Sequence, residues 1–297
     1  MVAMLIDPNR LLFLRAVVRA GSISAGARAL GWTQQAISQH LRDLERQIGT
    51  PVLLRSYHGV QPTEVGRALL SHADTIAAQL SAAELEIAEF TQLRRGTVRL
   101  AAYWSAMATL VPRALAILGS TIEVWLVTAD PDPALDMLRD GEIDLAVVFS
   151  SAHDPDRDTG AFVPTRIGSE EYHVLARLDH PVIGRPGTSF GDLAGESWVT
   201  GCVHCERHLH AAARAAGFAP VILQSANDHM VAQSFAAHGL ALTILPEPVH
   251  AAFPTPDVVS RGFPELQDRA VVVYRHPGVD HVPAIAATLD ALKRAAG

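Results

Sequence analysis

The sequence predicts an α/β protein in which a small helical head and one long helix precede a larger body. Residues 1–62 show helical spacing of apolar residues apart from one short hairpin, and residues 63–93 keep that spacing without a break. From residue 97 onward, short apolar runs alternate with helical segments. With 297 residues, 49% of them hydrophobic, the chain can bury a core in more than one domain.

The charges are divided unevenly along the chain. The formal net charge is −7, yet residues 1–62 hold seven arginines against three acids, whereas residues 96–297 carry 23 acids against 14 basic residues. A basic head on an acidic body indicates that the head meets a polyanion and the body does not. The single lysine, Lys293, excludes a G-x-x-x-x-G-K-[ST] phosphate-binding loop.

Targeting signals are missing from the sequence. No stretch has the roughly 18 to 20 apolar residues of a transmembrane helix, and Met1–Leu12 lacks the basic start and apolar run of a signal peptide. The two cysteines, Cys202 and Cys205, are too few for a disulfide framework. We therefore expect a cytoplasmic protein without a membrane partner.

The first helix of the head begins after Asp7-Pro8-Asn9 and ends at Ala20-Gly21. A second, short helix is capped by Ser22 or Ser24 and ends at the turn Gly31-Trp32.

Thr33 is placed to cap a third helix, which ends at Gly49-Thr50-Pro51. Its apolar stripe consists of Ala36, Ile37, Leu41, Leu44 and Ile48. Two helices joined by a tight turn that contains glycine form a helix-turn-helix, whose second helix enters the major groove of DNA.

Polar side chains on the third helix suit that groove. Amides pair bidentately with adenine, hydroxyls serve either hydrogen-bonding partner, and Arg42 can reach a phosphate. The alternative is that these side chains merely solvate the exposed face of a surface helix. The candidate DNA-binding residues of the first three helices are Ser24, Thr33, Gln34, Gln35, Ser38, Gln39 and Arg42.

A β-hairpin follows the third helix. Val52–Arg55 and Val60–Pro62 read as two short strands around Tyr57-His58-Gly59, which predicts a wing beside the helix-turn-helix. Arg55 is a candidate contact to the DNA backbone or minor groove, although an arginine on a small hairpin is often only solvated.

The block from Ser22 to Gly66 resembles the winged helix-turn-helix of LysR-type transcriptional regulators almost position by position. The family usually has an arginine where this chain has Gln39 and an acidic or similar polar residue where it has Leu54. The resemblance implies a sequence-specific regulator of transcription that responds to a small-molecule effector. No nucleophile, base and oxyanion-binding group converge in the pattern, so we expect no enzymatic activity, and no cofactor is expected. The helix that starts at Thr63 and the joint at Arg94-Arg95-Gly96 divide the chain into residues 1–62, 63–93 and 94–297.

The segment from Thr63 to about Gln92 predicts one long helix with Thr63 as its cap. Its apolar residues alternate four and three positions apart, as in a coiled coil, and are Leu69, Ala73, Ile76, Leu80, Ala83, Ile87 and Phe90. The alternative is an amphipathic helix packed on its own domain. The resemblance implies a homodimer or homotetramer whose paired heads bind an inverted-repeat operator in double-stranded DNA.

In the body, the alternation of strands and helices predicts parallel sheets covered by helices on both faces. The expected strands are residues 98–102, 121–127, 145–149, 172–175, 198–200, 221–223, 240–245 and 270–274. The expected helices are residues 105–118, 133–139, 204–216, 228–237 and 283–294. The resemblance implies two lobes of the periplasmic-binding-protein type, lobe I at about 96–163 and 267–297 and lobe II at about 164–266.

Ligands of open α/β sheets bind where strands end and helices begin. The effector-binding candidates at such places are Ser105, Ala106, Asp130, Thr200, Cys202, His204, Asn227 and Asp228. The positions matching Ser105, Thr200 and Asn227 commonly line the effector cleft in LysR-type proteins, but Ser105 and Asn227 are equally plausible as plain helix caps. The expected effector class is a small organic anion or an amino acid.

Two further patterns suggest other chemistry. Gly187-Thr188-Ser189-Phe190-Gly191 matches the G-x-S-x-G nucleophile motif, but no apolar strand precedes it, so we interpret it as a loop. Cys202, His204 and Cys205 at a helix start suggest an alternative in which the regulator senses metal or redox state. Against this, a second C-x-x-C is missing and free cysteine often serves as a small core residue.

Overall fold

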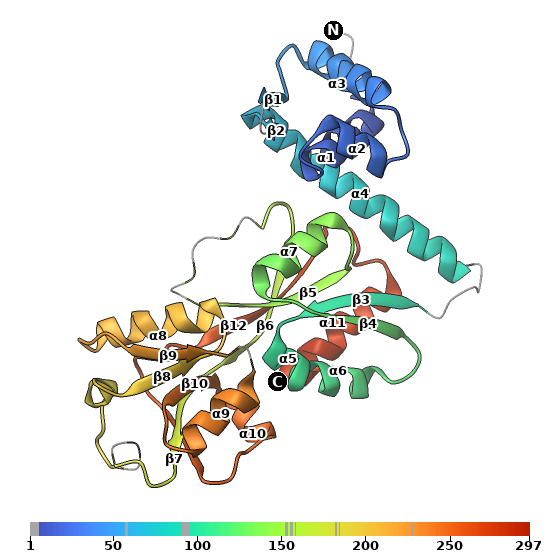
Figure 1. The fold of residues 1–297 in the computed structure, drawn as a ribbon. Helices are drawn as coiled ribbons and strands as arrows, with labels where there is room; N and C mark the ends of the chain where they lie inside the picture. The colour runs from blue at the N-terminus through green and yellow to red at the C-terminus, as the bar shows by residue number, and fades with distance from the viewer. Residues whose placement is uncertain are drawn as a thin grey trace.

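The computed structural model describes residues 6–56, 59–90, 96–151, 154, 157, 159–181, 183, 185–226 and 228–297. A helical head, one long helix and a two-lobed body follow one another along the chain (Figure 1). Within these ranges no helix combines the length and apolar character needed to cross a membrane.

The head contains three helices and a hairpin. These are α1 (Pro8–Arg19), α2 (Ile23–Ala29), α3 (Gln34–Ile48), β1 (Leu53–Ser56) and β2 (Gly59–Pro62). The side chains of Asp7, Ser22 and Thr33 each accept a hydrogen bond from a backbone N–H in the first turn of α1, α2 and α3. The helix-turn-helix and its wing are thus present as the sequence predicts.

The core of the head lies among α1, α2 and α3. Val17, Ile37 and Leu41 are fully buried there. A Cβ atom on Gly26 would lie 2.7 Å from the Cα of Val17, so glycine allows α2 to pack against the backbone of α1.

The long helix α4 (Glu64–Phe90) begins behind Thr63, whose hydroxyl accepts from the N–H of Gly66 at 3.0 Å. Part of its predicted apolar stripe is used inside the chain, since Ala73 is buried in the core of the head and Leu69 and Ile76 pack against that core. Leu80, by contrast, is 52% exposed. The exposed part of the stripe also contains Ala83, whereas the side chains of Ile87 and Phe90 lie outside the described part of the structure.

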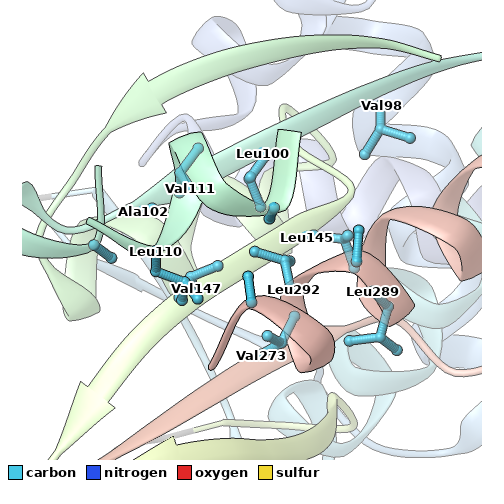
Figure 2. Packing of buried hydrophobic residues seen from close by; sticks show 14 of the residues in the cluster. Val98, Leu100, Ala102, Leu110, Val111, Leu145, Val147, Val273, Leu289 and Leu292 are labelled. Carbon is cyan, nitrogen blue, oxygen red and sulfur yellow. The ribbon is translucent and has the colours of Figure 1, made fainter. Parts of the chain in front are cut away.

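Lobe I is built on a five-stranded sheet in the order β4-β3-β5-β12-β6. Its strands are β3 (Thr97–Ala102), β4 (Glu123–Thr128), β5 (Leu145–Ser150), β6 (Val163–Glu170) and β12 (Arg269–Arg275). Its helices are α5 (Trp104–Ala108), α6 (Leu110–Leu118), α7 (Pro131–Asp140) and α11 (Pro283–Ala296). Helix α7 covers one face, and α6 and α11 cover the other, where Leu289 and Leu292 pack on Leu145 and Val273 (Figure 2).

Lobe II has a second five-stranded sheet in the order β11-β7-β10-β8-β9. Its strands are β7 (Tyr172–Arg177), β8 (Ser197–Thr200), β9 (Val221–Ser225), β10 (Leu242–Pro246) and β11 (Val258–Gly262). Its helices are α8 (Val203–Ala215), α9 (His229–Ala237), α10 (Glu247–Ala252) and the 3-10 turn η1 (Phe190–Leu193). Trp198, Phe190 and Leu209 are fully buried in the core of this lobe.

The boundary between the lobes differs from the prediction, which placed residues 164–266 in lobe II. Strand β6 pairs antiparallel with β12 and is therefore an edge strand of lobe I, so the chain crosses at Glu170–Tyr172. The sequence of β6 mixes polar and apolar residues, and its side chains alternate between exposed and half-buried positions along much of the strand. It therefore lacks the apolar run by which the other strands were recognised.

Two further expectations about the body need correction. Both sheets are mixed, because β12 runs antiparallel to β5 and β7 runs antiparallel to β10. The helix expected at 105–118 is two helices that break at Thr109, where φ is −122° and ψ is −64°. Pro112 lacks an N–H donor and is tolerated only in the first turn of a helix, which favours a new start at Leu110.

Candidate functional site

Helix α3 presents a polar face to solvent. Gln34, Gln35 and Arg42 are exposed, while Ile37 and Leu41 on the opposite face are fully buried. The side chains facing outward are therefore those that the sequence proposes for base and phosphate contacts.

Several of these polar side chains are held by neighbours within the head. The hydroxyl of Ser24 donates to Oε1 of Gln34 at 2.8 Å, so Ser24 positions a residue of α3 and does not cap α2. The Nε2 of Gln39 donates to Asp43 at 2.9 Å, and the Nε of Arg42 donates to the carbonyl of Ser38 at 3.1 Å. These hydrogen bonds restrict the rotamers on the exposed face.

The remaining head candidates have different surroundings. Thr33 uses its hydroxyl as the cap of α3, accepting from Ala36 N–H at 3.2 Å. Arg55 lies in β1, but its side chain is outside the part of the structure that is described. The wing is joined to α3 by Glu45, whose Oε1 accepts from the N–H of Val52 at 3.0 Å.

A small cleft lies where the two lobes meet. Its volume is about 20 Å³, which is room for a single water in this arrangement. Residues of both lobes line it, namely Tyr103, Trp104, Ser105, Asp130, Phe149, Gly201, Cys202, Cys205, His229 and Arg269.

The guanidinium of Arg269 is the centre of the cleft. Its Nε and Nη2 donate to Oε2 of Glu170 at 2.7 and 2.5 Å, and Nη2 also donates to the hydroxyl of Ser105 at 2.6 Å. Its Nη1 donates to the hydroxyl of Tyr172 at 3.3 Å. A charge that is only 2% exposed is thus compensated by one carboxylate and two hydroxyls.

Aromatic rings enclose the same guanidinium. Its central carbon lies 4.4 Å from the centre of the Phe149 ring and 4.8 Å from that of Tyr103. Burial raises the pKa of Tyr103 and Tyr172 far above the ordinary value, so both phenols stay protonated at neutral pH. Burial lowers the pKa of Arg269, but the acidic groups around it have the larger combined effect. The pKa of Arg269 therefore lies above its ordinary value.

Of the effector candidates, Ser105, Asp130 and Cys202 line the cleft. Ser105 does not cap α5, because its hydroxyl accepts from Arg269 and the N-cap residue is Tyr103. Asn227 lies outside the described residues.

The other effector candidates have other roles in the structure. Ala106 is fully buried in the core of lobe I, and Thr200 is fully buried with its hydroxyl bonded to Glu206 at 3.3 Å. Asp228 is exposed and caps α9 by accepting from the N–H of Met230 at 2.8 Å.

His204 faces lobe I. Its Nδ1 is 3.3 Å from Oδ1 of Asp154, which follows β5, and its Nε2 is 3.9 Å from Asp132 on α7. The hydrogen bond to Asp154 raises the pKa of His204. Burial raises the pKa of Asp154, but the hydrogen bonds from His204 and the Ser151 N–H have the larger combined effect. The pKa of Asp154 therefore lies well below its ordinary range.

Cys202 and Cys205 are in contact, with 3.3 Å between their sulfur atoms. The hydrogen bond between the thiols raises the pKa of Cys202 and lowers that of Cys205, which Arg269 lowers further. Over the described ranges, the His, Cys, Asp and Glu side chains form no cluster of three or more able to hold a metal ion.

Sequence reasoning missed Tyr103, Phe149, Cys205 and Arg269 as cleft residues. Tyr103 directly follows β3, and Phe149 lies near the end of β5. In the sequence both resemble aromatic residues of a core. Arg269 opens an apolar strand, and a charge at such a place signals a buried partner, but the sequence does not say which acid supplies it.

The G-x-S-x-G pattern is a loop, as expected. Ser189 precedes the short turn η1, and its hydroxyl and N–H both donate to the carboxylate of Asp192, at 3.0 and 2.9 Å. No described strand leads into it, so the strand-to-helix elbow of that motif is not formed.

Two family models match the chain. The model for the LysR substrate binding domain matches residues 91–297, and that for the bacterial regulatory helix-turn-helix protein of the lysR family matches residues 8–67. A probable HTH-type transcriptional regulator, LrrA of Synechococcus elongatus, is 27% identical over 97% of both chains. The nitrogen assimilation regulatory protein nac of Klebsiella aerogenes is 33% identical over 48% of both chains.

Solved structures share the fold. ArgP from Mycobacterium tuberculosis superposes with a TM-score of 0.70 at 22% identity, covering 99% of this chain and 98% of that one. LysG from Corynebacterium glutamicum, solved with bound effector Arg, gives 0.68 at 18% identity and covers 98% of each chain. CbnR in complex with its target DNA gives 0.56 at 21% identity, covering 98% of this chain and all of that one.

Proposed function

Because the chain belongs to the LysR family of transcriptional regulators, we propose that the exposed face of α3 reads its operator and that a small effector between the lobes controls this reading. The observation that carries the proposal is that α3 is a capped helix with one apolar and one polar face. Its apolar face is buried in the head, and its polar face carries Gln34, Gln35 and Arg42 into solvent.

Each side chain on this face has a chemical role in the proposal. Gln35 pairs its amide with a base edge, and Gln34, whose carbonyl oxygen is engaged by Ser24, offers its N–H groups. Ser38 and Gln39 extend the base-reading face, and Arg42 meets a phosphate. Thr33 keeps the start of α3 in place, and Arg55 of the wing contacts the backbone or minor groove.

The oligomer in the proposal pairs two heads through α4. Leu80 and Ala83 are exposed on a helix whose apolar spacing is that of a coiled coil, so a second copy of α4 can cover them. Two heads related by such pairing bind half-sites of an inverted repeat, spaced by one helical turn of DNA or a multiple of it. A homotetramer joins two such dimers.

The effector in the proposal is a small organic anion or an amino acid. Arg269 and Ser105 supply donors for a carboxylate, and Asp130 supplies an acceptor for an amino group. The cleft has room for only a single water in this arrangement, so such an effector binds when the lobes separate. A change in lobe separation alters the placement of the paired heads if the effector binds the two states with different affinity.

The test of DNA reading recovers and sequences the genomic fragments that bind the purified full-length protein at physiological salt. We expect a few enriched sites that share an inverted repeat. Gln35→Ala should weaken that enrichment, whereas Gln224→Ala, an exposed glutamine of lobe II, should leave it unchanged. Equal recovery of unrelated DNA, with and without cell extract as a source of effector, would contradict sequence-specific binding.

The test of the effector site measures thermal unfolding in the presence of amino acids and small organic acids. A true effector should raise the melting temperature of the wild type and of Asp290→Asn, a charge change on the exposed side of α11, but not that of Ser105→Ala, which removes a donor for the carboxylate that both effector classes share. The same ligand should change operator affinity. A ligand that stabilises all three proteins equally binds elsewhere.

A further inference from the structure

The two cysteines form a contact pair at the start of one helix. Cys202 is the N-cap residue of α8 and Cys205 lies in its first turn, and their sulfur atoms are 3.3 Å apart. A disulfide needs a sulfur separation of about 2.05 Å. Closing the bond therefore requires the two sulfur atoms to approach by only about 1 Å within a single helical turn.

The surroundings distinguish the two thiols. Cys205 is 6% exposed and lies beside the buried guanidinium of Arg269 and the hydroxyl of Tyr172. The hydrogen bond with Cys202 and the positive charge of Arg269 lower the pKa of Cys205, whereas the same hydrogen bond and burial raise that of Cys202. Cys205 is therefore the thiol of the pair that loses its proton first, and Cys202 keeps its proton.

Both sulfur-bearing residues line the cleft between the lobes, and Cys202 is only half-buried. The cleft has room for one water in this arrangement, so hydrogen peroxide, which is slightly larger than water, reaches the sulfur atoms when the lobes separate. Hydrogen peroxide is uncharged, so it enters without desolvating an ion.

We propose that Cys202 and Cys205 are a reversible dithiol site that hydrogen peroxide oxidises to a disulfide. The thiolate of Cys205 attacks one peroxide oxygen, the O–O bond breaks, and the leaving hydroxide takes a proton from solvent to become water. Cys205 is then a sulfenic acid. The sulfur of Cys202 displaces its hydroxyl group, which leaves with the proton of Cys202 as a second water, and the S–S bond forms.

The step balances with one proton from solvent and no reactant other than hydrogen peroxide. Each sulfur loses one electron, and the two peroxide oxygens gain both electrons and leave as two waters. A dithiol reductant of the cell restores the thiols by attacking the half-buried Cys202 sulfur through thiol–disulfide exchange.

Oxidation also changes the charges where the chain crosses between the lobes. It removes the negative charge beside Arg269, whose partners Glu170 and Ser105 belong to lobe I and whose partner Tyr172 begins the first strand of lobe II. The disulfide therefore changes the balance of charges beside β6 and β12, the strands next to the two crossings between the lobes. This regulatory consequence rests on the proposed function, whereas the thiol chemistry does not.

The experiment adds stoichiometric hydrogen peroxide to the reduced full-length protein and measures intact mass and free thiols after denaturation. We expect the wild type to lose both thiols and the mass of two hydrogen atoms, and dithiothreitol to restore both. Cys202→Ser should stop at a sulfenic acid that dimedone traps. Cys205→Ser, or Cys205→Ala if the serine variant does not fold, should keep its remaining thiol.

Two results would overturn the assignment: thiols that survive stoichiometric peroxide in the folded wild type, or a stable oxidised sulfur that never becomes a disulfide. Operator affinity is then compared between reduced and oxidised wild type, with Cys202→Ser as control. An unchanged affinity would refute the regulatory link. Failure of the reduced protein to bind any specific DNA would instead refute the proposed function, because mass and thiol counts are independent of DNA.

Discussion

Arg269 and Glu170 lie opposite each other on β12 and β6, the strands next to the two crossings between the lobes. The guanidinium Nε is 2.7 Å from Oε2 of the carboxylate, and both side chains are almost completely buried. Each ion is thus desolvated, and removing either partner would leave the other as a buried charge without compensation.

Removing one partner should cost far more than removing both. We expect Glu170→Leu or Arg269→Met alone to lower the free energy of unfolding by about 3–5 kcal/mol, because each leaves a buried charge unpaired. The double variant should lose clearly less than the sum of the two. Urea unfolding of the four proteins measures this, and additive losses would contradict a direct ion pair.

Gly26 should not tolerate alanine although it lies inside a helix. Helix propensity favours Gly26→Ala by about 1 kcal/mol. The new Cβ would lie 2.7 Å from the Cα of Val17, however, and backbone atoms of α1 cannot move aside as a flexible side chain does. We expect a net loss of stability in the head and of DNA affinity.

Gly31→Ala is the comparison for that variant. Gly31 has a φ of +70° with open space around its Cα, so alanine there suffers only backbone strain of about 1–2 kcal/mol. Thermal unfolding and limited proteolysis should rank Gly26→Ala below Gly31→Ala. A Gly26→Ala head as stable as the wild type would show that α1 and α2 pack less closely than described.

Arg42→Ala should weaken binding to specific and unrelated DNA alike. If Arg42 meets one phosphate, its loss should reduce the slope of log affinity against log salt by about one. Filter binding or fluorescence anisotropy across a salt series gives that slope. Arg214→Ala, which removes an exposed arginine from α8, is the control and should leave it unchanged. If the variant instead loses discrimination between sequences and keeps the same salt slope, Arg42 contacts a base and not a phosphate.

Leu80→Glu should separate the oligomer. Leu80 is 52% exposed on α4, and a carboxylate in the seam of a coiled coil is buried without a partner. Analytical ultracentrifugation should show a smaller species and operator affinity should fall. Leu178→Glu, an equally drastic change at a residue 63% exposed in lobe II, should leave the oligomer intact. A dimer that survives Leu80→Glu would place the pairing surface elsewhere.

The contact between His204 and Asp154 should depend on pH. The hydrogen bond to Asp154 raises the pKa of His204, so its contribution to stability is complete below the ordinary pKa of histidine and is lost as pH rises through the raised value. Hydrogen bonds hold the pKa of Asp154 down against the effect of burial, so its contribution is lost only in strong acid.

His204→Gln therefore should destabilise the protein more at about pH 6 than at about pH 9, by a difference of about 1 kcal/mol. Urea unfolding at the two pH values measures the difference. His238→Gln, at the exposed end of α9, is the matched control. Equal losses at both pH values would mean that His204 acts by packing alone.

Much of the head could be predicted because its signals are local. The side chains of Ser22 and Thr33 hydrogen-bond within three residues of themselves, and Gly49 ends α3 in the left-handed conformation. Strands β1 and β2 pair antiparallel although only two residues separate them in the sequence. Ser24 was misassigned as a possible cap because its partner, Gln34, belongs to the next helix.

The body shows where local signals end. Strand β6 escaped prediction because an edge strand needs no continuous apolar run, and its pairing with β12 joins segments about a hundred residues apart. Misplacing β6 also misplaced the boundary between the lobes. Ser105 was ambiguous for the same reason, since its hydroxyl partner is Arg269, 164 residues away.

The sequence by itself determined the succession of head, long helix and α/β body, the basic charge of the head, the polar and apolar faces of α3 and the close spacing of Cys202 and Cys205. These features depend on periodicity, caps and charge, which act over a few residues. Only the tertiary structure decided that Arg269 gathers Glu170, Ser105 and Tyr172 and lies beside Cys205. The physical reason is that a buried charge selects its partners through space. The strand order that brings them together depends on packing of the whole body and not on any local pattern.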